Sequence, residues 1–372
     1  MSQFGLMNAL EEMFSVPRAV PVSRAALGLF AVLKGWRGKQ EICRVALPAA
    51  ICHEVVVAVI AAGCDPIFCD VSPSDGLVVD SEWRRARELG ATVAIVVHLY
   101  GNPASLQAVR ELFPNPKCLV VDDAAQALGS RNAEGLCGGG GDVGLLSFGA
   151  TKHIAVGNAA LLFRDERLAA SVEALLKTIE PAPAGVRAEL ASSFRTQLEQ
   201  ARARLRMEGN AAAGAFSGLL NGLEPLLRVP ALPDADDRVL RAIEAYPTEI
   251  QARVAKSNAW SASLTGCGLA EVGMKAGCVP WRFVCRWPGA DWSSQAGLSE
   301  SLRSSGMHVS NWYLPAHWML GYAPGLLTGV EQLAREVLEF WVDASVSSDS
   351  IVRDARIVRR EMARLDGRGT GG

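Results

Sequence analysis

A chain of 372 residues, 49% of them hydrophobic and 20% charged, is long enough to bury a large core and to form two or three domains. Acidic residues outnumber basic ones by only 39 to 37, which excludes the strong charge that attracts nucleic acid or a membrane surface. The expected partners are small molecules or copies of the same chain. Residues 1–14 lack the pattern of a secretory signal, and the longest apolar run, 55–64, is too short to span a bilayer, so a cytoplasmic location is expected.

The first half of the chain alternates helix-like and strand-like segments. Short buried strands are expected at 42–47, 66–69, 93–97, 119–121, 143–148 and 159–163. Helices are expected at 23–36, at 81–89 with Asp80 as cap, at 103–113 opened by Pro103, and at 166–179. This alternation predicts an α/β fold in three layers, with helices on both faces of a mostly parallel sheet.

The second half is less regular. An Ala-, Arg- and Glu-rich stretch, 186–207, predicts a helix, and the prolines and aspartates of 230–237 predict a linker. Beyond it we expect a long helix from 238, a strand at 281–287, a helix near 298–304, and a helical tail from 330 through 338 and onward. The chain is therefore divided into a large domain, 1–235, and a smaller C-terminal α+β domain, 236–372.

The nine cysteines are scattered without a Cys-x-x-Cys pair, and the five histidines show no metal-binding spacing. Reduced core thiols fit this pattern better than disulfides, and no metal site is expected. Polar side chains instead gather where the expected strands end: Asp70, His98, Asp122, Asp123 and Ser147. Because ligands of open α/β sheets bind beyond the carboxyl ends of the strands, a site is expected there.

Lys152 is the most informative of the seven lysines. It alone closely follows an expected buried strand, where desolvation favours the neutral, nucleophilic amine that forms Schiff bases. A surface loop is the usual place for a lysine, and position alone favours that alternative.

Asp123 strengthens the case for a site at Lys152. A carboxylate at the end of its strand could pair with a protonated pyridine nitrogen and keep the ring cationic, although one aspartate of the pair, Asp122 above all, could equally cap a helix. Gln126 follows one helical turn later and could reach a phenolic oxygen, or could simply be exposed. Ser23 and Arg24 begin the first long helix and could bind a phosphate together with the Ser147 hydroxyl; each alone more often caps a helix or faces solvent. Together these residues offer the contacts that pyridoxal 5′-phosphate requires.

Three segments carry a resemblance to a known family: 98–103 (HLYGNP), 120–129 (VVDDAAQALG) and 138–152 (GGGGDVGLLSFGATK). With the segment 310–317, which contains Tyr-x-Pro-x-His, they resemble the DegT/DnrJ/StrS sugar aminotransferases of fold type I. About half of the chain takes part in the resemblance. The 29-residue separation of Asp123 and Lys152 is similar to that between the ring-nitrogen aspartate and the cofactor lysine of the family.

The resemblance implies a role for individual residues. Lys152 would carry the cofactor and shuttle protons, Asp123 would lie under the pyridine nitrogen, Gln126 beside the phenolic oxygen, and Ser147 on the phosphate. Three positions depart from the family: Val22-Ser23-Arg24 replaces Ser-Gly-Thr, so that Arg24 would grip the phosphate, Cys52 replaces the aromatic residue that stacks on the ring, and the Gly-x-Asn-x-Arg segment that reaches across the dimer is missing. Tyr313 and His317 would line a sugar pocket, with a core tyrosine and a surface histidine as alternatives.

The activity expected from the resemblance is amine transfer from glutamate or glutamine to a keto sugar, one linked to a nucleotide, in a homodimer. Such products serve surface polysaccharides or specialised metabolites. Elimination or action on a non-sugar metabolite is one alternative; Lys152 argues against the sugar dehydratases, which have a histidine at that position. A catalytically silent regulatory homologue is another. A nicotinamide-binding fold is poorly supported, since no G-x-G-x-x-G follows the first strand.

Overall fold

A seven-stranded sheet forms the larger part of the computed structural model, which describes residues 5–38 and 42–366. Across the sheet the strands are β1 (Arg18–Val22), β9 (Ala159–Phe163), β8 (Val143–Ser147), β5 (Leu119–Asp123), β4 (Val93–Val97), β2 (Arg44–Pro48) and β3 (Asp65–Cys69). Only β9 runs antiparallel to the others, through its pairings with β1 and β8. The expected mostly parallel sheet is therefore confirmed.

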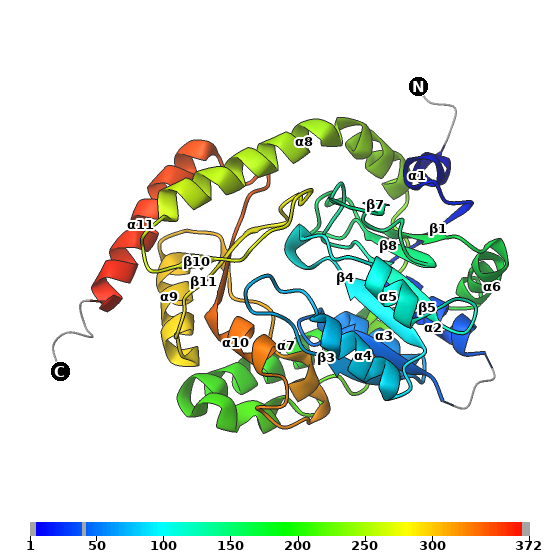
Figure 1. Ribbon diagram of the computed structural model, residues 1–372, viewed down its shortest axis with the longest axis horizontal. Coiled ribbons are helices and arrows are strands. Elements are labelled where there is room, and N and C mark those ends of the chain that lie inside the picture. Colours follow the sequence, from blue (N-terminus) through cyan, green and yellow to red (C-terminus); the bar gives the residue numbers. More distant parts are fainter. Residues whose placement is uncertain (1–4, 39–41, 367–372) are drawn as a thin grey trace.

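Helices cover both faces of this sheet (Figure 1). One core contains α2 (Ala25–Arg37), α3 (His53–Ala61) and α6 (Glu166–Leu176). On the other face lie α1 (Leu6–Phe14), α4 (Asp80–Glu88) and α5 (Gln107–Leu112). Alternate strand residues serve the two cores: Leu145 belongs to the first and Leu146 to the second, as the two-residue period of a strand requires. The three-layer arrangement is confirmed.

Most expected elements of this part lie within a few residues of the observed ones, with some corrections. The strand β1 and the helix α1 were not expected. Pro103 does not open a helix, because the next backbone N–H, that of Ala104, donates to Nδ1 of His98 at 2.8 Å, and α5 begins only at Gln107. Asp80 is the first residue of α4 and accepts no capping hydrogen bond. Short elements in the same region are η1 (Leu99–Gly101) and the hairpin β6 (Arg131–Asn132) and β7 (Gly135–Leu136).

A second, antiparallel sheet forms the centre of the C-terminal part. Its strands are β10 (Ala270–Glu271), β11 (Phe283–Arg286), β13 (Val337–Phe340) and β12 (Val309–Ser310), in this order. Around it lie α9 (Trp292–Ser304), η4 (Ala316–Leu320), α10 (Thr328–Glu336) and α11 (Ser348–Asp366). The helical tail expected from 330 onward is wrong at 337–340, because this segment pairs with β11 and β12 on both sides instead of continuing α10. The tail is helical again in α11. The α+β character is as expected.

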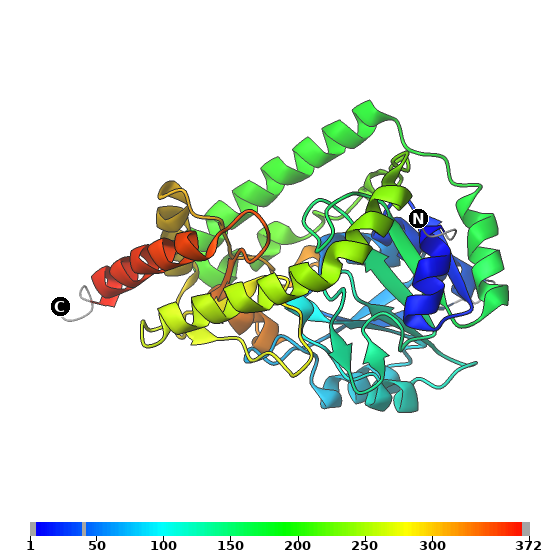
Figure 2. The same ribbon diagram turned by 90° about the horizontal axis from the view of Figure 1, so that it is seen from above.

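Two long helices connect these parts. The helix α7 (Ala184–Glu208) buries only Phe194, Ala201 and Leu205 and lies on the outside of the molecule (Figure 2); η2 (Gly209–Phe216) and η3 (Glu224–Leu226) follow it. The helix α8 (Ala235–Leu264) runs from α1 at one end to α11 at the other. A domain boundary at 235/236 stays a proposal: it falls at the start of α8, and α8 itself contacts both parts.

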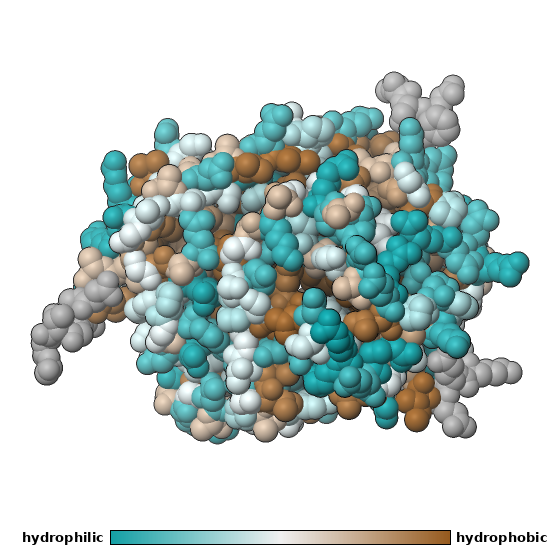
Figure 3. Space-filling model, viewed as in Figure 1, coloured by the Kyte–Doolittle hydropathy of each residue, from teal (hydrophilic) through white to brown (hydrophobic). Residues whose placement is uncertain are grey.

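On the face in Figure 3, hydrophilic and hydrophobic residues are interspersed. Over residues 5–38 and 42–366 the structure contains no helix that combines the length and the apolar character needed to cross a membrane. All nine cysteines are unpaired, and seven of them are buried.

Candidate active site

A cavity of about 750 Å³ lies beyond the carboxyl ends of β4, β5 and β8, where the strand-end polar residues predicted a site. It is closed on the other side by residues of the C-terminal part. Eight of the nine candidate site residues line this cavity: Ser23, Arg24, Cys52, Asp123, Gln126, Ser147, Lys152 and Tyr313. His317 is the exception.

Lys152 lies on the turn that follows β8, and its side chain is half-buried. Its backbone N–H donates to Gly149 at 2.9 Å, and its ammonium nitrogen lies 5.9 Å from the centre of the Trp281 ring. The indole N–H of Trp281 in turn donates to the carbonyl oxygen of Thr151 at 2.7 Å. The loop that presents the lysine is thus held by a residue of the C-terminal part.

The close approach of that segment depends on Gly101, which has a φ of 90°. A Cβ at this position would clash with the carbonyl oxygen of Val279, so a residue with a side chain would displace the segment that leads to Trp281. The same turn contains Tyr100, which adopts a φ of 62° although it has a side chain. Its N–H donates to Oε1 of Gln126 at 2.8 Å, and this bond helps to hold the left-handed conformation.

Asp123 is 4% exposed at the end of β5. Within the described residues its carboxylate accepts one hydrogen bond, from the N–H of Ala125 at 3.0 Å. Burial raises the pKa of Asp123, and the Ala125 N–H and the positive charge of Lys152 counteract this rise. The cavity wall therefore contains a desolvated carboxylate to which a cationic ligand would be complementary.

Asp122 has a different environment, because successive strand residues point to opposite faces. It is fully buried; one oxygen accepts from Nε2 of His98 at 2.6 Å, and the other accepts from the N–H groups of Gly138 and Gly140 at 2.9 and 2.8 Å. Since Nδ1 of His98 accepts from the backbone, the ring carries its proton on Nε2. Asp122 thus fixes the loop before β8 and caps no helix.

Gln126 joins the two parts of the molecule. Its amide nitrogen donates to the hydroxyl of Tyr313, which is buried in the cavity wall opposite the strand ends. Burial raises the pKa of Tyr313 well above its usual value, so this hydroxyl keeps its proton. It can therefore accept from Gln126 and still donate into the cavity.

An anion would be attracted to the start of α2. Ser23, Arg24, Ala25 and Ala26 line the cavity there, so the unpaired N–H groups of the first helical turn lie at its wall, with Ser147 beside them on the same cavity. Arg24 lines the cavity too, and its guanidinium is paired with the carboxylate of Glu54, with an Nε to Oε2 distance of 3.0 Å. The helix terminus, Ser147 and Arg24 are the candidate groups for binding an anion.

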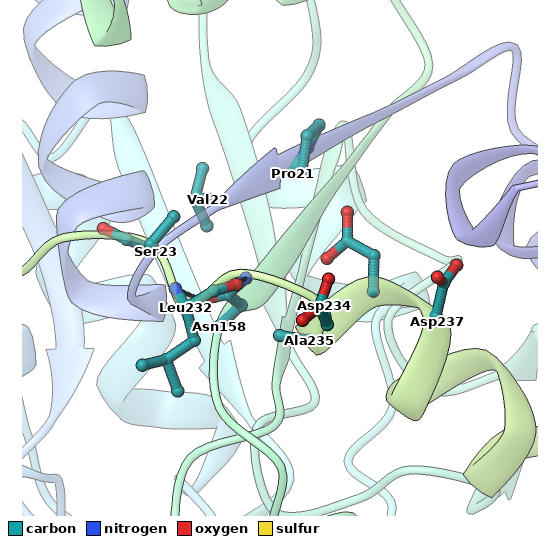
Figure 4. A pocket seen from close by; sticks show the side chains of 10 residues that line it. Pro21, Val22, Ser23, Asn158, Leu232, Asp234, Ala235 and Asp237 are labelled. Atoms are coloured by element: carbon teal, nitrogen blue, oxygen red, sulfur yellow. Dashed lines mark hydrogen bonds between the residues drawn. The ribbon is translucent and has the colours of Figure 1, made fainter.

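A second, smaller cavity of about 430 Å³ adjoins the first (Figure 4). The two share Ser23, Asn158 and Leu232, and the amide of Asn158 holds the linker by accepting from the N–H of Leu232 at 2.9 Å. Asp234 and Asp237 line the smaller cavity at the start of α8. These carboxylates repel anions, so an anionic group is favoured only on the α2 side.

One expectation needs correction, and one question about ring stacking is answered. His317 does not line the cavity: it is fully buried in η4, its Nε2 lies 3.3 Å from Oε1 of Glu331, and burial lowers its pKa to about 4, which keeps the ring neutral. Cys52 lines the cavity but supplies no aromatic face, and the ring of the next residue, His53, packs on Phe194 at 4.7 Å instead. The aromatic rings of the cavity come from the C-terminal part.

The C-terminal part forms one wall of the cavity, and most residues of this wall were not predicted from the sequence: Trp281, Arg282, Ser310, Trp312, Glu339 and Trp341. Arg282 is 3% exposed and lies between two of these rings, with its guanidinium carbon 4.6 Å from the centre of the Trp281 ring and 4.1 Å from that of Trp341. Its charge is directed to Asp343, whose carboxylate is 3.1 Å away. The expected strand at 281–287 and the segment 310–317 contained part of this wall, but nothing in the sequence pointed to Glu339.

Comparison with known proteins identifies relatives of this chain. Residues 6–208, more than half of the chain, match the profile of the DegT/DnrJ/EryC1/StrS aminotransferase family. Among curated proteins, a GDP-perosamine synthase of Escherichia coli O157:H7 is 26% identical over 160 residues, which are 43% of this chain and 44% of that protein. A dTDP-3-amino-3,4,6-trideoxy-alpha-D-glucose transaminase of Micromonospora megalomicea subsp. nigra is 39% identical over 98 residues, 26% of each chain.

The curated relatives are thus matched over less than half of their length. The likeness in structure extends further. The crystal structure of DesV from S. venezuelae superposes with a TM-score of 0.74 at 21% identity, covering 96% of this chain and 88% of that one. At this identity the superposition establishes a shared fold for both the large sheet and the C-terminal part.

Proposed function

The chain belongs to the DegT/DnrJ/EryC1/StrS aminotransferase family, and from this premise we propose that it transfers an amino group from glutamate or glutamine to a keto sugar linked to a nucleotide. One observation carries the proposal. Asp123, the last residue of β5, and Lys152, which follows the adjacent parallel strand β8, line the same cavity together with the start of α2.

The residues of the cavity fit the cofactor of this family. Pyridoxal 5′-phosphate, when bound, supplies an electron sink for a substrate carbon and carries the amino group from donor to acceptor. The buried carboxylate of Asp123 is complementary to a protonated pyridine nitrogen. The first turn of α2 and the hydroxyl of Ser147 suit a phosphate, and the acidic neighbouring cavity does not.

Each residue then has one task. Lys152 holds the cofactor and moves the proton at the reacting carbon, as base for the donor and as acid for the acceptor. Asp123 keeps the pyridine nitrogen protonated. Gln126 and Tyr313 lie beside the phenolic oxygen of the cofactor. Because their side chains are hydrogen-bonded to each other, they also hold the C-terminal part against the cofactor. Cys52 contributes a thiol to the cavity wall. The ring of Trp281, whose centre is 5.9 Å from the side-chain nitrogen of Lys152, is an aromatic ring beside the lysine.

The substrate class rests on the relatives. Two of them are, by their names, a GDP-perosamine synthase and a dTDP-3-amino-3,4,6-trideoxy-alpha-D-glucose transaminase, so both names contain a sugar linked to a nucleotide. We extend this chemistry to the present chain, with products for surface polysaccharide or specialised metabolites, a homodimer as the working form, and a cytoplasmic location. A lysine at 152 on the cavity wall supports amine transfer over dehydration.

The test uses the purified protein with pyridoxal 5′-phosphate, glutamate and dTDP-4-keto-6-deoxyglucose. The expected result is 2-oxoglutarate formed together with an aminated sugar, and neither product with the Lys152→Ala variant. Loss of water from the sugar without consumption of glutamate would support elimination instead. A protein that develops no absorbance of lysine-bound cofactor would be the silent homologue, and either result contradicts the proposal.

A further inference from the structure

Glu339 occupies an unusual place in the small sheet. It lies on β13, between β11 and β12, directly opposite Val284 and Ser310. Its strand neighbours Leu338 and Phe340 point into the core beneath the small sheet. The alternation of the strand therefore turns Glu339 to the opposite face, where it lines the main cavity.

One oxygen of the Glu339 carboxyl group is buried without a hydrogen-bond partner. The residue is 1% exposed, and among the described residues its Oε1 has no hydrogen-bond partner and its carboxylate no ion pair. Burial raises its pKa to about 8, while Arg282 and the Ser310 hydroxyl act in the opposite direction. The hydroxyl of Tyr100 is also buried without a hydrogen-bond partner, and the charge of Glu339 contributes to raising its pKa. The site thus has unused hydrogen-bonding capacity.

A nearby glutamate shows that this is not a general feature of the small sheet. Glu336, at the end of α10, is also 1% exposed, but its two oxygens accept from Arg286 at 2.8 Å and from the N–H of Gly289 at 3.0 Å. A buried carboxyl group without partners destabilises a fold, whereas a paired one is tolerated. Glu339 is therefore better explained by a ligand than by the fold.

The surroundings indicate the chemistry of that ligand. Trp281, Trp312 and Trp341 line the same cavity, and Ser310 adds a hydroxyl. Arg282, the cation that acts on Glu339, is stacked between two indole rings and paired with Asp343. Aromatic faces beside an unpaired acceptor suit a ring with apolar C–H faces and hydroxyl groups at its edge, and they do not suit the carboxylates of an amino acid donor.

We propose that Glu339 is a specificity-determining residue that accepts a hydrogen bond from a ring hydroxyl of the acceptor sugar, while the indoles of Trp281, Trp312 and Trp341 pack against the sugar ring. The inference rests on the proposed function and deepens it. A site built to bond a hydroxyl discriminates strongly against analogues that lack it, because its own polar group is then left unpaired.

The test measures binding without turnover, with dTDP-glucose and dTDP as probes and tryptophan fluorescence or calorimetry as the readout. For Glu339→Leu we expect the affinity for dTDP-glucose to fall about 10- to 100-fold and the affinity for dTDP to stay unchanged. Glu339→Gln keeps an acceptor oxygen and should lose less. The matched control is Glu336→Gln, for which the ratio of the two affinities should equal that of the wild type.

Thermal stability separates this role from a structural one. Removing an unpaired buried carboxyl should raise the Tm of Glu339→Leu, whereas removing the paired carboxylate should lower the Tm of Glu336→Gln. The proposal is overturned if Glu339→Leu binds both probes like the wild type, or if the wild type does not prefer dTDP-glucose to dTDP. Because no amine is transferred in this experiment, a failure of the proposed function would appear only in the glutamate assay, and the two outcomes stay distinguishable.

Discussion

The cavity has two walls of different construction. The strand-end wall, formed by Asp123, Ser147 and Lys152, follows parallel strands of the large sheet within 30 residues of chain. The small-domain wall, formed by Trp281, Arg282, Ser310, Trp312, Glu339 and Trp341, is drawn from three short antiparallel strands and the loops beside them. The first wall carries the groups proposed for proton transfer and cofactor binding, and the second carries aromatic rings and a carboxyl group. We therefore propose that the first wall performs the chemistry and that the second selects the substrate.

The largest effect is expected from Lys152→Ala on the strand-end wall. Without the amine there is no group to move the proton, so kcat for amine transfer should fall at least about 10³-fold, and the absorbance of the lysine-bound cofactor should vanish. The control is Lys177→Ala, which changes an exposed lysine at the end of α6. If Lys152→Ala kept the kcat and the cofactor absorbance of the wild type, the chemistry could not be assigned to the strand-end wall.

A smaller loss is expected for Asp123→Asn. Removing the charged partner of a buried cation costs about 3–5 kcal/mol, which corresponds to a fall of about 10²- to 4 × 10³-fold in amine transfer. The neighbouring Asp122→Asn is the matched control: its amide nitrogen cannot accept a hydrogen bond, so it loses either the bond from His98 or those from Gly138 and Gly140. It should lower the Tm and leave the turnover of the folded fraction nearly intact. Equal turnover losses in the two variants would show that Asp123 has no special role.

Tyr313→Phe tests the contact between the two walls. It removes one hydrogen bond to Gln126, so a fall of about ten-fold in kcat/KM is expected, with a modest decrease in Tm. Tyr322→Phe, at a tyrosine that is 43% exposed, should change neither quantity. If Tyr313→Phe were as harmful as Asp123→Asn, the chemistry could not be assigned to the strand-end wall alone.

The smallest effect is a pH dependence of stability on the small-domain wall. The pKa of Glu339 is about 8 in the folded chain and 4.5 without its surroundings, so the folded state binds more protons between these values. The contribution of Glu339 to stability is therefore most favourable below pH 4.5, declines as the pH rises to about 8, and is constant above.

Thermal melts of the wild type and Glu339→Gln should show a gain in Tm for the variant that grows across this window. Arg282, Tyr100 and Tyr313 face the same group and are unchanged in the comparison. A gain that does not vary with pH would mean that Glu339 is already charged or paired.

The difference between the walls also decides what the sequence could predict. Most helices and strands of the large sheet, though not β1 and α1, and the positions of Asp123 and Lys152 follow from local signals: short apolar runs, strand ends and a motif in one contiguous block. Glu339 was hidden because residues 330–338 read as one helix, and only the pairing of β13 with β11 and β12 ends that helix at Glu336. Arg24 and His317 were both expected to face a ligand, but only Arg24 lines the cavity. Their pairing with Glu54 and Glu331, 30 and 14 residues away along the chain, was not predicted. Such pairings depend on tertiary contacts that no local pattern contains.

The central claim is that the strand-end wall holds the cofactor through Lys152. The most direct test is to load the protein with pyridoxal 5′-phosphate, reduce it with borohydride, digest it, and identify the peptide that retains the pyridoxyl group. The account predicts a single modified lysine, Lys152, out of the seven in the chain. Modification of a different lysine, or of none, would contradict it.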